Sequence, residues 1–150
     1  SQLPRVLVDA MLGRLVTYLR MCGYDAVYSP DEELESDDAL HEFARAENRT
    51  LLTRDRELAA RARDAVLLES RDIEDQLAEL DAAGFELELP EEPRRCSNCN
   101  GRVEPVAPTE TTPEYAPTAA ETDIWRCEAC GQHFWKGSHW DDVARRLAGR

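Results

Sequence analysis

TLLTRDREL, residues 50–58, combines a short apolar and β-branched run with an abrupt change to a helical pattern after Thr53. The change of period predicts a strand over residues 50–53 and a helix that begins at about residue 55. Asp55 is then placed at the C-terminal tip of a strand. Because ligands bind at this end of the strands in an open parallel α/β sheet, the stretch marks both the fold and a candidate site.

Strand-like and helix-like segments alternate throughout residues 1–90. Other strands are predicted at residues 5–8, 25–28 and 65–68, with a fifth, edge strand at 86–89. Helical spacing predicts helices over residues 10–22, after a cap at Ser36, over residues 55–63 and from Ile73 to a stop at Gly84. The alternation predicts an α/β fold of three layers, with helices on both faces of a central parallel sheet.

The sequence PEEP at residues 90–93 separates this unit, residues 1–90, from a second unit, residues 94–150. The second unit is interrupted by residues 106–122, which are rich in Pro, Thr, Glu and Ala and predict a flexible insert. A short helix is expected from residue 139 or 140 to residue 147. So small a unit needs a stabilising element of its own.

That element is predicted from four of the five cysteines, which form two CxxC motifs, Cys96 with Cys99 and Cys127 with Cys130. Four thiolates in two such pairs are typical of a closed, structural zinc site. An iron site and a redox pair are alternatives, and His133 and His139 are available as substitute ligands. The fifth cysteine, Cys22, lies in a helical pattern and is interpreted as a small buried hydrophobic residue.

Acidic residues follow each predicted strand or open the next helix, at Asp9, Asp37, Asp55 and Asp72. In a right-handed parallel arrangement these positions share one edge of the sheet. Clustered carboxylates repel one another unless a cation neutralises them, and Mg²⁺ or Mn²⁺ prefers such oxygen ligands. Because these ions promote phosphodiester cleavage, the cluster indicates a metal-dependent nuclease with these four acids as catalytic residues.

The alternative interpretation is that each of these acids only caps a helix. Asp38 competes with Asp37 for the inward position, and Glu69 and Asp75 compete with Asp72. His41, in the middle of a helix, is interpreted as a surface or packing residue rather than a general base.

Basic and aromatic side chains are candidate RNA contacts. Arg14, Arg54 and Arg56 border the acidic edge, where they either grip a phosphate or form salt bridges with the surplus acids. Lys136, the sole lysine, is a further candidate for a phosphate contact. The aromatic residues of the second unit either pack its small core and dock it onto the first unit or stack on bases, and they are Trp125, Phe134, Trp135 and Trp140.

Residues 6–80 resemble a PIN-like ribonuclease domain, through VLVDAMLGRLVTYLRMCGYD (6–25), DDALHEFA (37–44) and LLTRDREL (51–58). With the cysteine pairs and FWKGSHW (134–140), nearly the whole chain resembles the family named for the Mut-seven C-terminal ribonuclease domain, in which a PIN-like domain precedes a zinc ribbon. The resemblance implies that Asp9, Asp37 and Asp55 occupy the places of that family's Mg²⁺- or Mn²⁺-binding acids. Asp72 is a looser match to the last acid, and PIN domains usually have Glu where this chain has Asp37.

The composition bears on partners and on location. The chain has 31 acidic residues against 17 Arg and one Lys, for a net charge of −13, which resembles proteins of salt-loving archaea. Such a charge ordinarily argues against nucleic acid, but at molar salt the Debye length falls to about 3 Å and long-range repulsion largely vanishes. The same salt would weaken contacts that depend on counterion release. No apolar run reaches membrane length and no secretory signal is present, so a soluble cytoplasmic protein is expected.

The sequence therefore predicts a divalent-metal-dependent ribonuclease whose partner is RNA, with the ribosome and ribosomal RNA as candidates, and whose zinc ribbon helps to engage it. The alternative is a non-catalytic RNA- or ribosome-associated adaptor that makes its contacts through the ribbon. A third interpretation is a protein-interaction module that does not bind nucleic acid.

Overall fold

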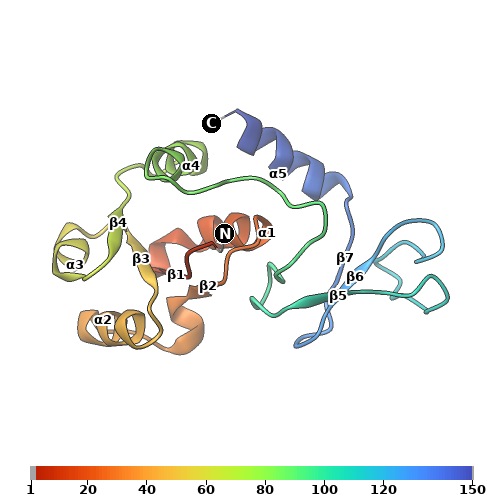
Figure 1. The fold of residues 1–150 in the computed structure, drawn as a ribbon, viewed down its shortest axis with the longest axis horizontal. Helices are drawn as coiled ribbons and strands as arrows, with labels where there is room; N and C mark the ends of the chain where they lie inside the picture. Colours follow the sequence, from red (N-terminus) through yellow and green to blue (C-terminus); the bar gives the residue numbers. More distant parts are fainter. Residues whose placement is uncertain (1–2, 150) are drawn as a thin grey trace.

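The computed structural model describes residues 3–149, and its centre is a four-stranded parallel sheet with the order β2-β1-β3-β4 (Figure 1). The strands are β1 (Val6–Val8), β2 (Ala26–Tyr28), β3 (Thr50–Thr53) and β4 (Ala65–Leu67). The two central strands, β1 and β3, are buried along their whole length. Burial on both faces explains their continuous apolar sequence, which is typical of parallel strands.

Helices cover both faces of this sheet, which confirms the predicted α/β layers. They are η1 (Ala10–Leu12), α1 (Gly13–Met21), η2 (Ser29–Glu32), α2 (Asp37–Ala46), α3 (Arg56–Arg61) and α4 (Ile73–Ala82). Successive side chains of a strand point to opposite faces. Val6 and Val8 of β1 accordingly join the core beneath α1 and α4, whereas Leu7 joins a smaller core beneath α2 and α3.

The second unit contains a three-stranded antiparallel sheet of β5 (Val103–Pro105), β6 (Trp125–Cys127) and β7 (His133–Phe134). We call the segment from Arg94 to Phe134 the ribbon. The chain then returns to the first unit through α5 (Ser138–Ala148), which lies beside α4 in Figure 1. Val143 and Leu147 of α5 are buried in the core beneath α1 and α4. No helix within residues 3–149 combines the length and the apolar character of a membrane span.

One segment differs from the simple sequence pattern. Residues 86–89 do not form the expected edge strand, although burial alternates along them. The alternation is satisfied because Phe85 and Leu87 pack into the core, while the Glu86 carbonyl accepts a hydrogen bond of 3.0 Å from the Tyr24 hydroxyl instead of a strand partner. Both ends of the insert at residues 106–122 are anchored, since Val106 and Ala119 are buried in a third small core.

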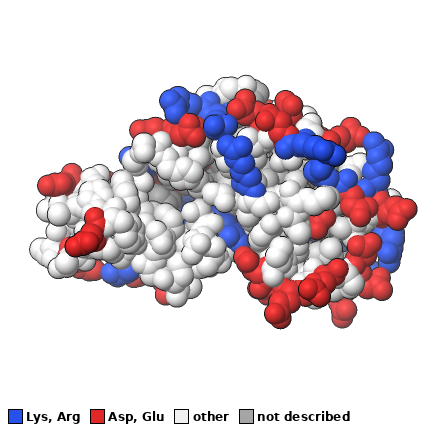
Figure 2. Space-filling model, turned by 180° about the vertical axis from the view of Figure 1, so that it is seen from behind, with Lys and Arg blue, Asp and Glu red and all other residues white. Residues whose placement is uncertain are grey.

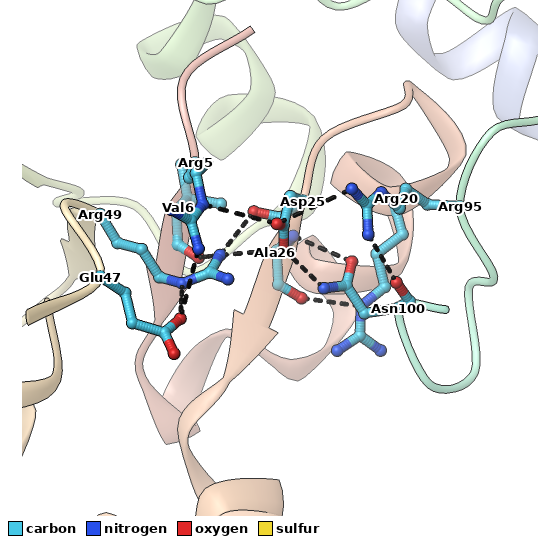
Figure 3. Close-up of polar contacts among 9 residues, drawn as sticks. All are labelled: Arg5, Val6, Arg20, Asp25, Ala26, Glu47, Arg49, Arg95 and Asn100. Atoms are coloured by element: carbon cyan, nitrogen blue, oxygen red, sulfur yellow. Dashed lines mark hydrogen bonds and ion pairs between the residues drawn. The ribbon is translucent and has the colours of Figure 1, made fainter. Parts of the chain in front are cut away.

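Asp25 holds the ribbon against the amino-terminal edge of the parallel sheet (Figure 3). Its carboxylate accepts hydrogen bonds from Asn100 of the ribbon at 2.7 Å and from Arg49 at 3.0 Å. The Asn100 side chain in turn accepts the Ala26 backbone N–H at 3.0 Å, which extends the edge of β2 toward the ribbon. Burial alone would raise the pKa of Asp25, but the hydrogen bonds from Arg49 and Asn100 outweigh it and lower the pKa below its ordinary value.

Replacing Asp25 with Ala should lower the free energy of unfolding by about 1.5–3 kcal/mol, the usual contribution of hydrogen bonds to charged groups. The loss is expected because the Arg49 side chain is only 4% exposed and would keep its charge without this partner. Since the folded-state pKa of Asp25 is lowered, the contribution is complete above about pH 4 and is lost as the pH falls through the folded value. Urea unfolding of wild type, Asp25→Ala and the exposed control Asp123→Ala tests this, and equal stability of all three at pH 7 would contradict it.

Candidate active site and metal centre

Asp9 and Asp55 lie at the carboxyl ends of the neighbouring strands β1 and β3 and are linked through Thr53. The Thr53 hydroxyl donates to Asp9 Oδ2 at 2.7 Å and accepts the Asp55 backbone N–H at 3.0 Å. Thr53 is fully buried, and its hydrogen bonds therefore fix the relative positions of the two acids. Parallel pairing of Val8 with Leu52 brings the two strand ends to the same edge of the sheet.

Each of these acids also caps a helix, as the alternative interpretation required. Asp9 Oδ1 accepts the Ala10 N–H at 2.8 Å, and Asp55 Oδ1 accepts the Leu58 N–H at 3.1 Å. Capping occupies only one oxygen of each carboxylate. Oδ2 of Asp55 accepts no hydrogen bond within the described chain, so this exposed oxygen is available to a ligand.

Asp37 is exposed at the first position of α2, where the Ser36 hydroxyl performs the capping by accepting the Ala39 N–H. Its neighbour Asp38 forms an ion pair of 3.0 Å with Arg61. Of the two adjacent acids, Asp38 is therefore engaged in the protein, and Asp37 is the one with no partner among residues 3–149.

Asp72 takes the N-cap position of α4 but makes no capping hydrogen bond. The turn before it is held by Glu79, whose carboxylate accepts the backbone N–H groups of Glu69 at 2.8 Å and Ser70 at 3.0 Å. These hydrogen bonds outweigh the effect of burial and lower the pKa of Glu79. Asp75 lies in the first turn of α4, and the choice among Asp72, Glu69 and Asp75 stays a prediction.

The carboxylates do not form a preformed cage. Within residues 3–149, the only group of three or more His, Cys, Asp or Glu side chains whose ligand atoms lie within 4.8 Å of one another is that of the four cysteines. Convergence of Asp9, Asp37 and Asp55 on one ion therefore stays a prediction. A Mg²⁺ ion does not require such a cage, because it commonly keeps several waters and binds through one or two carboxylates plus substrate phosphate.

The basic residues expected to bind phosphate lie in different environments. Arg14 is exposed in the first turn of α1 and has no ion-pair partner in the described part of the chain. Arg54 is half-buried next to Asp55, and its Nε donates to no atom of residues 3–149. Arg56 is engaged in an exposed ion pair with Glu69 at 2.8 Å. Lys136 lies in the segment between the ribbon and α5, with its Nζ 5.4 Å from the centre of a tryptophan ring.

Two contacts at the acidic edge have no local signal in the sequence. One is the link through Thr53. The other is the Tyr28 hydroxyl, which donates to the Ala10 carbonyl at 2.7 Å and so ties the end of β2 to the turn after Asp9. Gly13 permits this approach, because a Cβ there would lie 2.9 Å from the Tyr28 oxygen. An apolar strand that ends in Thr is the one feature that could have indicated Thr53.

The second site is the cluster of four cysteines in the ribbon. The Sγ atoms of Cys99 and Cys127 are 3.5 Å apart, and those of Cys96 and Cys130 are 3.7 Å apart. Four sulfurs at about 2.3 Å from a tetrahedral ion would be about 3.8 Å from one another, whereas a disulfide requires about 2.05 Å. The geometry therefore fits a bound metal ion such as zinc and excludes disulfide pairs.

The backbone around the sulfurs is also arranged for a charged cluster. Backbone N–H groups of Cys99 and Cys130 donate to the Sγ atoms of Cys96 and Cys127 at 3.4 Å. A Cβ at Gly101 would lie only 2.8 Å from Cys127 Sγ, so a glycine is required there. Burial raises the pKa of Cys96 to about 12. Burial alone would also raise the pKa of Cys130, but hydrogen bonds from the Gln132 backbone and the neighbouring thiols outweigh it and lower the pKa to about 7. A bound cation would favour the deprotonated form of every thiol that coordinates it.

Comparison with known proteins identifies the family of the chain. The family model described as the Mut7-C RNAse domain matches residues 4–147, which include both the parallel sheet and the ribbon. No curated protein and no solved structure matches the chain.

Proposed function

The chain belongs to the Mut7-C RNAse domain family, and from this premise we propose that it hydrolyses RNA at the acidic edge of the parallel sheet with the help of Mg²⁺ or Mn²⁺. The residues assigned to the ion are Asp9, Asp37 and Asp55, with Asp72 as an additional acid. The substrates are RNA phosphodiester bonds, and the ribbon helps to hold the RNA.

One observation carries the proposal, namely the connection of Asp9 and Asp55 through the buried Thr53 hydroxyl. A capping role alone needs no such link between two strands, because each acid caps its own helix. Carboxylates that must share a ligand do need fixed relative positions, and hydrogen bonds around metal ligands provide such fixed geometry. Oδ2 of Asp55 and the exposed carboxylate of Asp37 would supply further hard oxygen donors if Asp37 converges with Asp9 and Asp55, as the proposal requires.

A divalent ion bound there would neutralise charge on the phosphodiester. It would also lower the pKa of a water molecule bound to it, so that hydroxide forms more readily near neutral pH. The protein residues contribute position and charge. Thr53 orients Asp9, while Tyr28 fixes the turn that follows it. Arg14 and Arg54 have no ion-pair partner within residues 3–149, so they are available to bind phosphate oxygens, as guanidinium groups do in bidentate fashion.

The non-catalytic adaptor is the second candidate, and two observations favour it. The carboxylates form no closed ligand group among the described residues. The ribbon is docked at the amino-terminal edge of the sheet, through Asn100 and Asp25, and so lies away from the acids. An adaptor of this kind would bind RNA through the ribbon without cleaving it.

The two candidates are distinguished by incubating the zinc-loaded protein with labelled single-stranded RNA, first without added divalent ion and then with Mn²⁺ or Mg²⁺. The proposed ribonuclease cleaves only after the ion is added. Omission of the ion is preferable to a chelator, because chelation would also attack the cysteine site. Binding without cleavage at every ion concentration, and at both low and molar salt, would favour the adaptor and reject the enzyme.

A further inference from the structure

A cavity of about 330 Å³ lies between the ribbon, the end of α1 and the start of α5. Its wall is formed on one side by Met21, the last residue of α1, and by Arg95 and Ser97 of the ribbon. On the other side Trp135 and Trp140 flank the turn into α5. The volume falls at the lower end of the range for small-molecule sites, about 300–1,000 Å³, so one planar ring system fits better than a long ligand.

The cavity contains no acidic side chain, although the chain has 31 acidic residues among 150. Its charged and titratable lining residues are Arg95, His133 and His139. On the face shown in Figure 2 the ribbon side of the molecule carries few charged groups, whereas acidic and basic groups crowd the sheet unit. The cavity is therefore a place on this acidic protein where an anionic polymer can approach without strong local repulsion.

The lining also offers the groups that recognise a base. Aromatic rings stack on bases of any sequence, and both Trp135 and Trp140 are only partly buried. His133 also lines the cavity, although its Nδ1, which has no hydrogen-bond partner within residues 3–149, is buried. Lys136 holds its ammonium group 5.4 Å from the Trp140 ring centre, beside the cavity, where a phosphate would be attracted.

We infer that this cavity binds one unpaired base of single-stranded RNA, with Lys136 facing an adjoining phosphate, whereas Arg95 is held by an ion pair of 3.7 Å with Asp25. The inference rests on the proposed function in taking RNA as the ligand, but it does not require the acidic edge to be active. Trp135 packs against the third core and Trp140 against the core beneath α1 and α4, so in this inference each would stack through the part of its ring that stays exposed, whereas Trp125 is buried.

The cavity and the acids lie at opposite ends of α1. Asp9 precedes η1, whereas Met21 ends α1 at the cavity. With a rise of about 1.5 Å per residue in an α-helix and about 2 Å in a 3₁₀-helix, the separation is on the order of 18 Å. At roughly 3.4 Å per stacked nucleotide this corresponds to about five nucleotides. The cavity would therefore bind a base several nucleotides from the cleaved bond and favour longer RNA over dinucleotides.

The test measures binding of a labelled RNA octamer by the full, zinc-loaded chain without added Mg²⁺ or Mn²⁺, so that cleavage does not interfere. An abasic octamer of equal charge is the matched ligand. Trp140→Ala should weaken RNA binding by about 5- to 150-fold and leave abasic binding unchanged. Ser138→Glu, at the first position of α5, places an acid in the cavity at a helix start that favours it, so it should weaken RNA binding without loss of folding.

Arg145→Ala removes an exposed charge from the same helix and is the control. Wild-type affinity for RNA in both cavity variants, or equal wild-type affinity for RNA and the abasic octamer, would overturn the inference. Normal RNA cleavage with unchanged binding in these variants rejects the cavity alone, whereas cavity-dependent binding without cleavage under any ion condition rejects the proposed enzyme alone. Quenching of tryptophan fluorescence by an unstructured peptide but not by RNA would show that the cavity binds a protein segment. That result would also overturn the inference.

Discussion

RNA cleavage should fall by roughly 10³-fold or more when Asp9 is replaced by Asn, because loss of a ligand should exceed the 10- to 100-fold effects typical of residues around it. The fold should survive. An Asn oxygen can still accept the Ala10 N–H that Asp9 Oδ1 accepts at 2.8 Å, and the Thr53 hydroxyl can rotate to accept from the Asn amide. The substitution thus removes charge and leaves the helix cap.

Thr53→Val provides a graded comparison. Valine keeps the shape of threonine but removes the hydroxyl that joins Asp9 to the backbone of Asp55. Since Thr53 would orient a ligand without contacting the ion, we expect a smaller loss, about 10- to 100-fold in metal affinity. Asp55→Asn should resemble Asp9→Asn. Asp123→Asn makes the same chemical change at an exposed position in the second unit and should cleave RNA at the wild-type rate.

Two measurements are needed for this series. Initial rates of RNA cleavage report activity, and titration with Mn²⁺ followed by its electron paramagnetic resonance signal reports ion binding independently of the substrate. Circular dichroism and thermal unfolding check that each variant is folded. If Asp9→Asn and Asp55→Asn bind Mn²⁺ and cleave RNA like the wild type, the two acids are helix caps only.

The sequence was sufficient for the layers of the sheet unit and for the positions of its strand ends. The abrupt change from an apolar run to a helical pattern after Thr53 located β3, and the same logic located β1 before Asp9. These predictions depend on local periodicity, which buried parallel strands and their connecting helices express strongly. The four cysteines were predictable because their spacing carries the geometry of the ligand set.

Other features depend on contacts between distant residues and have no local signal. Asn100 and Asp25 are hydrogen-bonded although they lie 75 residues apart in the sequence, so the docking of the ribbon at the amino-terminal edge could not be inferred from either segment alone. The mistaken strand at residues 86–89 has a related cause. Alternation reports only that one face is buried, and Leu87 is buried by the core without a neighbouring strand. The cavity beside Trp140 likewise exists only because α5 returns to the first unit.

Removal of metal from the cysteine cluster should unfold the ribbon while the parallel sheet remains folded. Metal binding contributes about 10–16 kcal/mol in small zinc-binding peptides, and the ribbon has little else to stabilise it. Its third core consists of Val106, Ala119 and Ile124 with Trp135 packed against them. The core beneath α1 and α4, by contrast, spans the sheet and includes α5.

Cys96→Ser should therefore reduce bound zinc from about one equivalent to well below half an equivalent, as expected for a site with four thiolate ligands. Cys22→Ser is the matched control, since Cys22 is buried at the C-cap of α1 and outside the cluster, and it should keep full zinc content. Elemental analysis measures the metal, and hydrogen exchange followed by mass spectrometry locates the unfolding.

The expected exchange pattern is uneven along the chain. In Cys96→Ser, β5, β6 and β7 should lose protection, because their short ladders depend on the two CxxC turns. Strands β1 and β3 should stay protected in the buried centre of the parallel sheet. Helix α5 should be protected in part, since Val143 and Leu147 pack on the first unit. Equal loss of protection in β1 and β6 would show instead that sheet and ribbon unfold as one cooperative unit, with the Asp25 network strong enough to couple them.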